Sequence, residues 1–288
     1  MTPASAQATA PAKGVAVSNP FGESEAKSTK DAGVAWIRTD IGIAQRVTQT
    51  YSVARAAGLS IVGIVSYWTV DNPDSFTLQN WENAIQTVQS AYPGIRVWEV
   101  WNEPTCSKYQ HGYMDGTPQR YFDLLRSAYT ILKARDPTAT VLGIGGAQLG
   151  KDRDRDFTSS VFSLGGGAYM DALAIHAYPY ELNAGKTWDY YKQLWLGELS
   201  YYAQFGKPLW VTETGLRSDQ TSESEQASYL EMSYSFFKRP EIVAYFWYVL
   251  TDSSDGPWGL LRLDLSAKPS YFSYYNIESY KLAVKRRY

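Results

Sequence analysis

The sequence predicts a single (β/α)8 barrel. Short apolar runs typical of strands alternate with longer runs typical of helices, and this pair occurs eight times along the chain. The strand-type runs are nearly continuously apolar, as expected for parallel strands covered on both faces. With 288 residues the chain has room for one such barrel, which typically takes about 250 residues. A doubly wound open sheet is the alternative, but its usual glycine-rich first turn is missing from the segment SNPFGES at 18–24.

The first half of the chain supplies four strand–helix pairs. Ser24 fits the cap of the first helix and Gly33 its end, while Gly58 ends the second helix directly before an apolar run. Thr117 and Pro118 are typical cap and first-turn residues of the fourth helix. We expect strands at 14–19, 36–40, 61–67 and 97–104, and helices at 24–33, 51–58, 81–92 and 118–135.

The second half repeats the pattern. Its strand-type runs are again apolar and β-branched, and the segments between them are long enough for helices. Neither Gly145-Gly146 nor the glycines at 165–167 are followed by the Lys-Ser or Lys-Thr of a phosphate loop, so we interpret both as turns. We expect strands at 141–147, 172–179, 209–215 and 242–250, and helices at 157–164, 188–205, 222–237 and 271–285.

The first thirteen residues, MTPASAQATAPAK, differ in composition from the rest. They are rich in Ala, Thr, Ser and Pro, and we expect a disordered segment or linker at 1–13 before a catalytic barrel at 14–288. Their Ala-x-Ala spacings are similar to a signal-peptide cleavage region, although no charged or apolar region precedes them. We therefore expect a secreted, extracellular or periplasmic protein.

Composition excludes several classes of function. The net charge is −2 and the only basic cluster is at 285–287, so nucleic acid is not expected as a partner. No run approaches the roughly 18 apolar residues of a membrane span. The single cysteine, Cys106, cannot form an internal disulfide, and no HExxH or CxxC motif indicates a metal. We expect no cofactor, and the sequence carries no signal for an oligomeric state.

Two strand-type runs end in a carboxylate. VWEVWNEP at 97–104 ends in Asn102 and Glu103 before a proline, and LWVTETG at 209–215 carries Glu213 before a glycine. Pro104 cannot continue a strand, so both glutamates should lie where the strands end, at the face where barrels keep their chemistry. Glu103 and Glu213 are 110 residues apart, which places them on strands four and seven. Two carboxylates at strand ends suit cleavage of a glycosidic bond.

The neighbouring residues suggest roles for the two glutamates. A proton donor at Glu103 needs apolar or negative surroundings, and Trp101 is the candidate neighbour. An ionised Glu213 needs a cation, and Arg38 on strand two is the best candidate. Arg38 has a structural alternative, a pair with Asp40 or Glu99. Glu99 faces the same way as Glu103, but lower in the barrel, and would need a partner there.

WNEP at 101–104 and TETG at 212–215 together resemble clan A of the glycoside hydrolases, the retaining (β/α)8 enzymes. DAGVAWIRTD at 31–40, AAGLSIVGIVSY at 56–67 and KPSYFSYY at 268–275 extend the resemblance, which is strongest to the short family 39-like members, with family 5 as the nearest competitor. The resemblance implies Glu103 as acid/base, Glu213 as nucleophile and Asn102 as partner of the substrate 2-hydroxyl. It further implies Arg38, His176 and Tyr178 beside the nucleophile, and Trp247 as an aromatic floor beneath the sugar.

Other residues have two interpretations. Trp68, after strand three, is a candidate for stacking on a neighbouring sugar, or belongs to the core together with Tyr67. His111 is expected on the surface, and Asp255 either binds hydroxyls or is solvated. The expected substrate is an oligo- or polysaccharide. A glycan-binding barrel without activity and a family 5-type endo-glucanase or mannanase are the alternatives.

Overall fold

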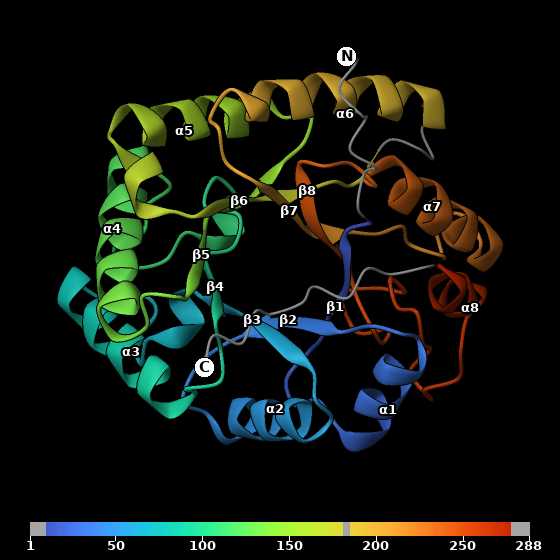
Figure 1. Ribbon diagram of the computed structural model, residues 1–288, viewed down its shortest axis with the longest axis horizontal. Coiled ribbons are helices and arrows are strands. Elements are labelled where there is room, and N and C mark those ends of the chain that lie inside the picture. Colours follow the sequence, from blue (N-terminus) through green and yellow to red (C-terminus); the bar gives the residue numbers. More distant parts are fainter. Residues whose placement is uncertain (1–9, 181–184, 278–288) are drawn as a thin grey trace, which may run out of the picture.

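The computed structural model describes residues 10–180 and 185–277, and within them the fold is a closed barrel. Its strands pair in parallel in chain order, and β1 pairs with β8 to close the ring (Figure 1). This confirms the predicted (β/α)8 fold. The strands are β1 (Ala12–Ala16), β2 (Trp36–Asp40), β3 (Ser60–Val65), β4 (Val97–Val100), β5 (Thr140–Gln148), β6 (Ala172–His176), β7 (Leu209–Thr214) and β8 (Ile242–Trp247).

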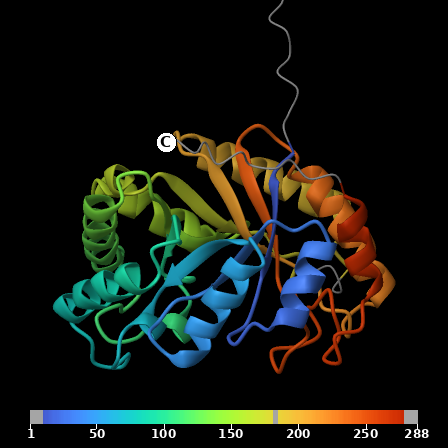
Figure 2. The same cartoon turned by 60° about the horizontal axis from the view of Figure 1, so that its bottom comes forward.

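The helices surround the strands (Figures 1 and 2). Several begin at hydroxyl caps: the side chains of Thr77, Thr117, Thr187 and Ser222 each accept a hydrogen bond from the backbone N–H three residues on. Within the described residues no helix is both long and apolar enough to cross a membrane. The helices are α1 (Glu23–Asp31), α2 (Gln45–Ala56), α3 (Leu78–Ala91), α4 (Pro118–Arg135), α5 (Asp152–Ser163), α6 (Trp188–Ala203), α7 (Glu223–Phe236) and α8 (Pro269–Asn276).

Some element boundaries differ from the prediction. The strand expected at 14–19 begins at Ala12, because the Lys13 side chain is buried against helix ends. Helix α2 starts six residues before 51; Val47 is the only large apolar residue at 45–50, and Ala44 has no capping side chain. Gly145 and Gly146 lie within β5, at an irregularity in its pairing with β6, and not in a turn. The expected helix at 271–285 is described only as far as α8, since residues 278–288 lie outside the described part, as do residues 1–9 of the expected N-terminal segment.

The barrel interior changes from apolar to charged along its axis. Near the N-terminal ends of the strands, the rings of Trp36, Trp210 and Phe246 pack together, with centroids 5.8 and 6.3 Å apart. Gly14 on β1 makes room for Phe246, since a Cβ there would lie 2.3 Å from the ring. Two residues along β2 from Trp36, the inward position is Arg38. The charged layer above the aromatic rings leads to the mouth of the barrel.

Candidate active site

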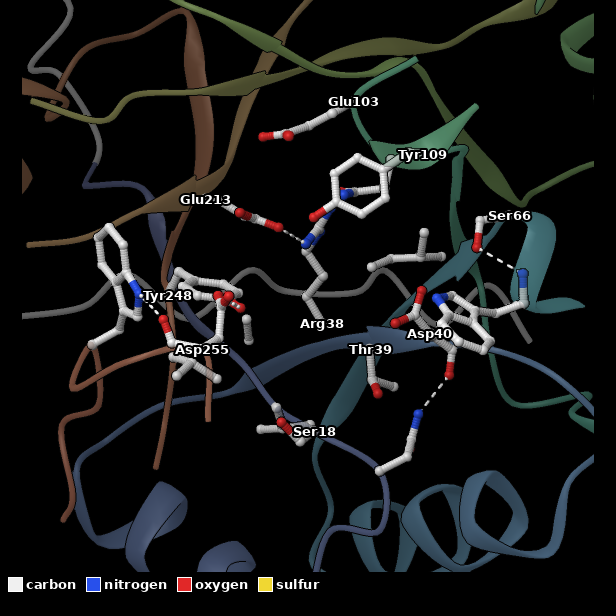
Figure 3. A pocket seen from close by; sticks show the side chains of 18 of the residues that line it. Ser18, Arg38, Thr39, Asp40, Ser66, Glu103, Tyr109, Glu213, Tyr248 and Asp255 are labelled. Atoms are coloured by element: carbon white, nitrogen blue, oxygen red, sulfur yellow. Dashed lines mark hydrogen bonds and ion pairs between the residues drawn. The ribbon is translucent and has the colours of Figure 1, made fainter. Parts of the chain in front are cut away.

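A pocket of about 390 Å³ opens at the C-terminal ends of the strands. Its lining includes Arg38, Asn102, Glu103, Tyr178 and Glu213, so five of the eight residues singled out from the sequence lie around one cavity (Figure 3). A sixth, Trp68, lies in the same lining, and its side chain is 54% exposed at the rim.

Glu103 and Glu213 face each other across this pocket. One oxygen of each carboxylate and Nδ1 of His176 all lie within 4.8 Å of one another. Glu213 is in β7, whereas Glu103 directly follows β4 in an unusual backbone conformation, with φ of 44° there and 71° at Trp101. Positive φ at residues other than glycine is uncommon and is found mostly at functional sites.

The residues of β5 at which its pairing with β6 is irregular hold the segment around Glu103 in place. The backbone N–H of Glu103 donates to the Gly145 carbonyl at 2.6 Å. A Cβ on Gly145 would lie 2.8 Å from the Trp101 carbonyl, and one on Gly146 would lie 2.2 Å from Nε2 of His176. Both glycines also have positive φ. Glycine at these two positions therefore allows the close approach of β5 to Glu103 and His176.

Glu213 accepts two strong hydrogen bonds. Nη1 of Arg38 donates to one oxygen at 2.5 Å (Figure 3). The Tyr178 hydroxyl donates to the other at 2.6 Å. Burial and the charge of Glu213 raise the pKa of Tyr178 well above its usual value, so the hydroxyl keeps its proton. Each carboxylate oxygen of Glu213 therefore has its own donor, and the two bonds orient the side chain.

Arg38 also binds Glu99, so both interpretations of this arginine hold. Its Nε and Nη2 donate to the two Glu99 oxygens at 2.6 and 3.1 Å, and Nη2 donates to Oδ1 of Asn102 at 2.9 Å. Burial alone would lower the pKa of Arg38. The negative charges of Glu99 and Glu213 have a larger effect, so the pKa of Arg38 is raised. Because Oδ1 of Asn102 accepts from Arg38, the amide nitrogen is left to face the pocket.

The surroundings of Glu103 differ from the prediction. Nδ1 of His176 lies 2.9 Å from Glu103, and Gln148 Nε2 donates to the same oxygen at 2.8 Å. Burial raises the pKa of Glu103, but the hydrogen bond and charge of His176 and the bond from Gln148 outweigh it, so the net pKa is lowered. The pKa of His176 is raised, against its burial, by Glu213 and Glu103. Both shifts favour the carboxylate form of Glu103 beside the imidazolium form of His176.

Trp101 was expected to favour the neutral form of Glu103, and this is wrong. The indole is fully buried on the outer side of the strand, packs against Trp81 at 5.8 Å, and donates to the Tyr109 carbonyl. The polar surroundings come instead from the ends of β5 and β6.

A family model described as "Glycosyl hydrolase catalytic core" matches residues 67–264, more than half of the chain. The chain belongs to this family. The expected resemblance to the glycoside hydrolases is therefore confirmed. A search of curated proteins gives no match.

Solved structures of similar fold include other glycosyl hydrolases. A family 39 glycoside hydrolase from Bacteroides cellulosilyticus WH2 is 24% identical with a TM-score of 0.67; the match covers 92% of this chain and 63% of that one. A GH128 subgroup II endo-beta-1,3-glucanase from Sorangium cellulosum is 18% identical with a TM-score of 0.68, covering 94% and 100%. The chain thus spans less than two thirds of the family 39 structure. At these identities the similarity supports the fold alone.

Trp247 was expected to form an aromatic floor beneath a sugar in the pocket of this glycosyl hydrolase, and this position is wrong. Its side chain is fully buried, its ring lies 6.0 Å from that of Tyr229 on α7, and its Nε1 donates to the Trp258 carbonyl. The next residue, Tyr248, lines the pocket instead, together with Trp258. Strand alternation could have indicated Tyr248, because Ala244 and Phe246 are the inward residues of β8.

Two further residues were assigned from the sequence. His111 lies at the surface, as expected, but is partly covered: its ring stacks on Tyr67 at 4.1 Å and its Nδ1 lies 3.0 Å from the exposed Asp74. Asp255 lines the pocket and accepts a hydrogen bond from the Tyr248 hydroxyl at 2.9 Å.

Glu103, His176 and Glu213 are close enough in space to offer one ligand atom each to a metal ion. Their atoms already have other partners, since Arg38 and Tyr178 bind Glu213 and Gln148 binds Glu103. A guanidinium 2.5 Å from Glu213 also repels a cation. The arrangement suits acid–base and nucleophilic chemistry by the side chains themselves.

Proposed function

We propose that this protein is a retaining glycoside hydrolase that cleaves β-glycosidic bonds in an oligo- or polysaccharide, with Glu213 as nucleophile and Glu103 as acid/base. The observation that carries the proposal is the approach of the two carboxylates to within 4.8 Å. Retaining enzymes hold these groups about 5–5.5 Å apart, whereas inverting enzymes leave roughly 6.5–9.5 Å to admit a water.

In the first step, an oxygen of Glu213 attacks the anomeric carbon and the bond to the leaving oxygen breaks. Glu103 donates its proton to that oxygen, and a glycosyl ester forms on Glu213. In the second step, Glu103 takes a proton from water, the water oxygen attacks the anomeric carbon, and the ester bond breaks.

The surrounding residues fit these roles. Arg38 and Tyr178 orient the two oxygens of Glu213. The amide nitrogen of Asn102, which is not used by the described residues, can donate to a substrate hydroxyl. His176 holds the proton that Glu103 must carry when the leaving group is in place. We also propose that Trp68 stacks on a neighbouring sugar, and that the enzyme acts outside the cytoplasm, where polysaccharides are found.

The first prediction tests the nucleophile. Glu213→Gln keeps the shape of the side chain but removes its charge, so turnover of aryl β-glycosides and of a polysaccharide panel should fall by roughly 10⁴-fold or more. Glu23→Gln, an exposed glutamate at the start of α1, is the matched control and should behave as wild type.

The stereochemistry of the first product decides the mechanism. Proton NMR of the wild-type reaction should show the β-anomer before mutarotation. Appearance of the α-anomer first would contradict the double displacement, and binding without turnover across the panel would favour a glycan-binding barrel.

A further inference from the structure

Asp40 is an acidic side chain of the pocket to which the proposed mechanism gives no role. It is the last residue of β2, two residues after Arg38, so it shares the inward face of that strand one step nearer the mouth. Figure 3 shows it beside Arg38, on the opposite side from Glu213 in that view. No hydrogen bond or ion pair from any described residue reaches its carboxylate.

Asn19, which follows β1, holds the backbone of Asp40. Its Nδ2 donates to the backbone carbonyl of Asp40 at 2.9 Å. Oδ1 of Asn19 lacks a partner among the described residues, but it is enclosed by protein, so a ligand in the pocket does not reach it. The acceptor that this wall of the pocket offers to a ligand with hydrogen-bond donors is therefore the carboxylate of Asp40.

The wall of the pocket that Asp40 and Trp68 form also has a flat apolar face. Trp68 follows β3, the strand next to β2, and lines the same pocket with 54% of its surface exposed. Tyr67 supports it, with ring centroids 4.9 Å apart. An exposed aromatic face beside acceptor oxygens is suited to a sugar ring, which has apolar C–H faces and hydroxyl donors at its edge.

The position of Asp40 in the barrel indicates which part of the substrate would lie beside it. Glu103 is held by Gln148 on β5 and His176 on β6, and its role places the leaving group on that side of the barrel. In the closed barrel, β2 lies opposite β6. A sugar beside Asp40 therefore belongs to the glycone, the part that is transferred to Glu213.

We propose that Asp40 binds hydroxyl groups of the glycone, and that this wall selects neutral sugars and rejects uronic acids. The inference rests on the proposed function for the direction of the substrate. A uronate would meet the charge of Asp40, while Arg38, the arginine in the lining of this pocket, is already bound to Glu99, Glu213 and Asn102. Arg46 on α2 also acts on Asp40, but it lies outside the pocket lining. Lys108, also in the lining, follows β4 on the Glu103 side.

The charge of Asp40 should also be visible in the pH dependence of binding. Burial and the charges of Glu213 and Glu99 raise the pKa of Asp40 to about 6, against the opposing effect of Arg38. Affinity for a neutral glycone should therefore fall below about pH 6, where Asp40 becomes protonated and a weaker acceptor. The charged or titratable groups that act on or face Asp40 are Arg38 on β2, Arg46 on α2, Tyr67 after β3, Glu99 on β4 and Glu213 on β7.

The test compares Asp40→Asn with Asp71→Asn, an exposed aspartate after β3 that lies outside this pocket. On the best neutral substrate, Asp40→Asn should lose about 10- to 100-fold in kcat/KM, the effect of one hydrogen bond to a charged group. The KM of wild type should rise below about pH 6, whereas the KM of Asp40→Asn should not. Asp71→Asn should match wild type in kcat/KM and in the pH dependence of KM. Wild type should not hydrolyse matching aryl glucuronides.

A second measurement separates this inference from the proposed function. Calorimetric binding of neutral oligosaccharides to Glu213→Gln, with and without Asp40→Asn, requires no turnover. A loss of affinity in the double variant supports the role of Asp40 even if hydrolysis is never found. Equal affinity of the two, or uronic acid oligomers binding as well as neutral ones, would overturn it.

Discussion

Two of the cations buried within the described residues, Arg38 and Lys13, lie at opposite ends of the barrel and are satisfied in different ways. Arg38 lies in the mouth with two carboxylates as partners. Lys13, near the start of β1, is 1% exposed and donates only to backbone carbonyls, those of Ala32, Tyr274 and Ile277, at the ends of α1 and α8. Both are buried, yet only one is neutralised by opposite charge.

The difference follows from what each side chain can do with its proton. A guanidinium stays charged in any protein environment, so its burial requires carboxylates. An ammonium can lose its proton, and burial lowers the pKa of Lys13 to about 8. The mouth of the barrel therefore needs a permanent positive charge that organises Glu99 and Glu213. The base of the barrel needs only hydrogen-bond donors that join the ends of α1 and α8 to β1.

The largest expected effect comes from exchanging one cation type for the other. In Arg38→Lys a single ammonium replaces the planar fork, and it cannot bind Glu99, Glu213 and Asn102 together. We expect kcat to fall roughly 10²- to 10³-fold, as on loss of an electrostatic donor in an active site. Steady-state kinetics with an aryl glycoside would measure this, with circular dichroism as the check on folding. An unchanged kcat would mean that charge alone is enough at this position.

A smaller effect is expected from Glu99→Gln, which removes one of the two carboxylates and leaves Arg38 paired with Glu213. The amide can still accept from Arg38 and from Thr212, which now donates to Glu99 at 3.1 Å. We expect about a 10-fold loss of kcat, equivalent to one weakened charged hydrogen bond. A loss as large as that of Arg38→Lys would show that Glu99, rather than Glu213, is the essential partner of the guanidinium.

The smallest effect on activity is expected at the base of the barrel. Lys13→Met should leave kcat unchanged and lower the free energy of unfolding by about 1–3 kcal/mol, since buried carbonyls lose their donor. Lys27→Met, an exposed lysine on α1, is the control. Urea unfolding followed by fluorescence would measure both.

The difference in the free energy of unfolding between wild type and Lys13→Met should increase with pH. Because the pKa of Lys13 is lower in the folded chain than the ordinary lysine value of 10.5, the unfolded chain binds more protons between about pH 8 and 10.5. Wild type should therefore gain stability relative to Lys13→Met as the pH rises through this window. A constant difference would indicate that the ammonium keeps its proton inside the fold.

The sequence was sufficient for the barrel and for the positions of the two glutamates. Strand-type runs ending in WNEP and TETG place side chains at the mouth whatever the details of the loops. It was not sufficient for the partners of Glu103. Gln148 reaches it because β5 is irregular between Gly143 and Ala147, and such a shift in register leaves no pattern in hydrophobicity.

The aromatic residues show a different limit. Trp247 is the larger ring on β8, but alternation along the strand turns it outward and Tyr248 inward. Trp258 reaches the pocket from the segment after β8, where no periodicity applies. Asp40 could be placed on the inward face from the sequence, but its lack of a partner depends on Arg38 being fully occupied, which only the structure shows.

The anchoring of Glu103 on Gly145 has a consequence for engineering. Glu103 is positioned by a strand of the barrel wall, through a backbone hydrogen bond to Gly145. If Glu103 and Glu213 act as proposed, loops elsewhere around the pocket could be exchanged to change which ligands are accepted while the two carboxylates stay aligned. Substitutions at Gly145 or Gly146, by contrast, would displace Glu103 and His176.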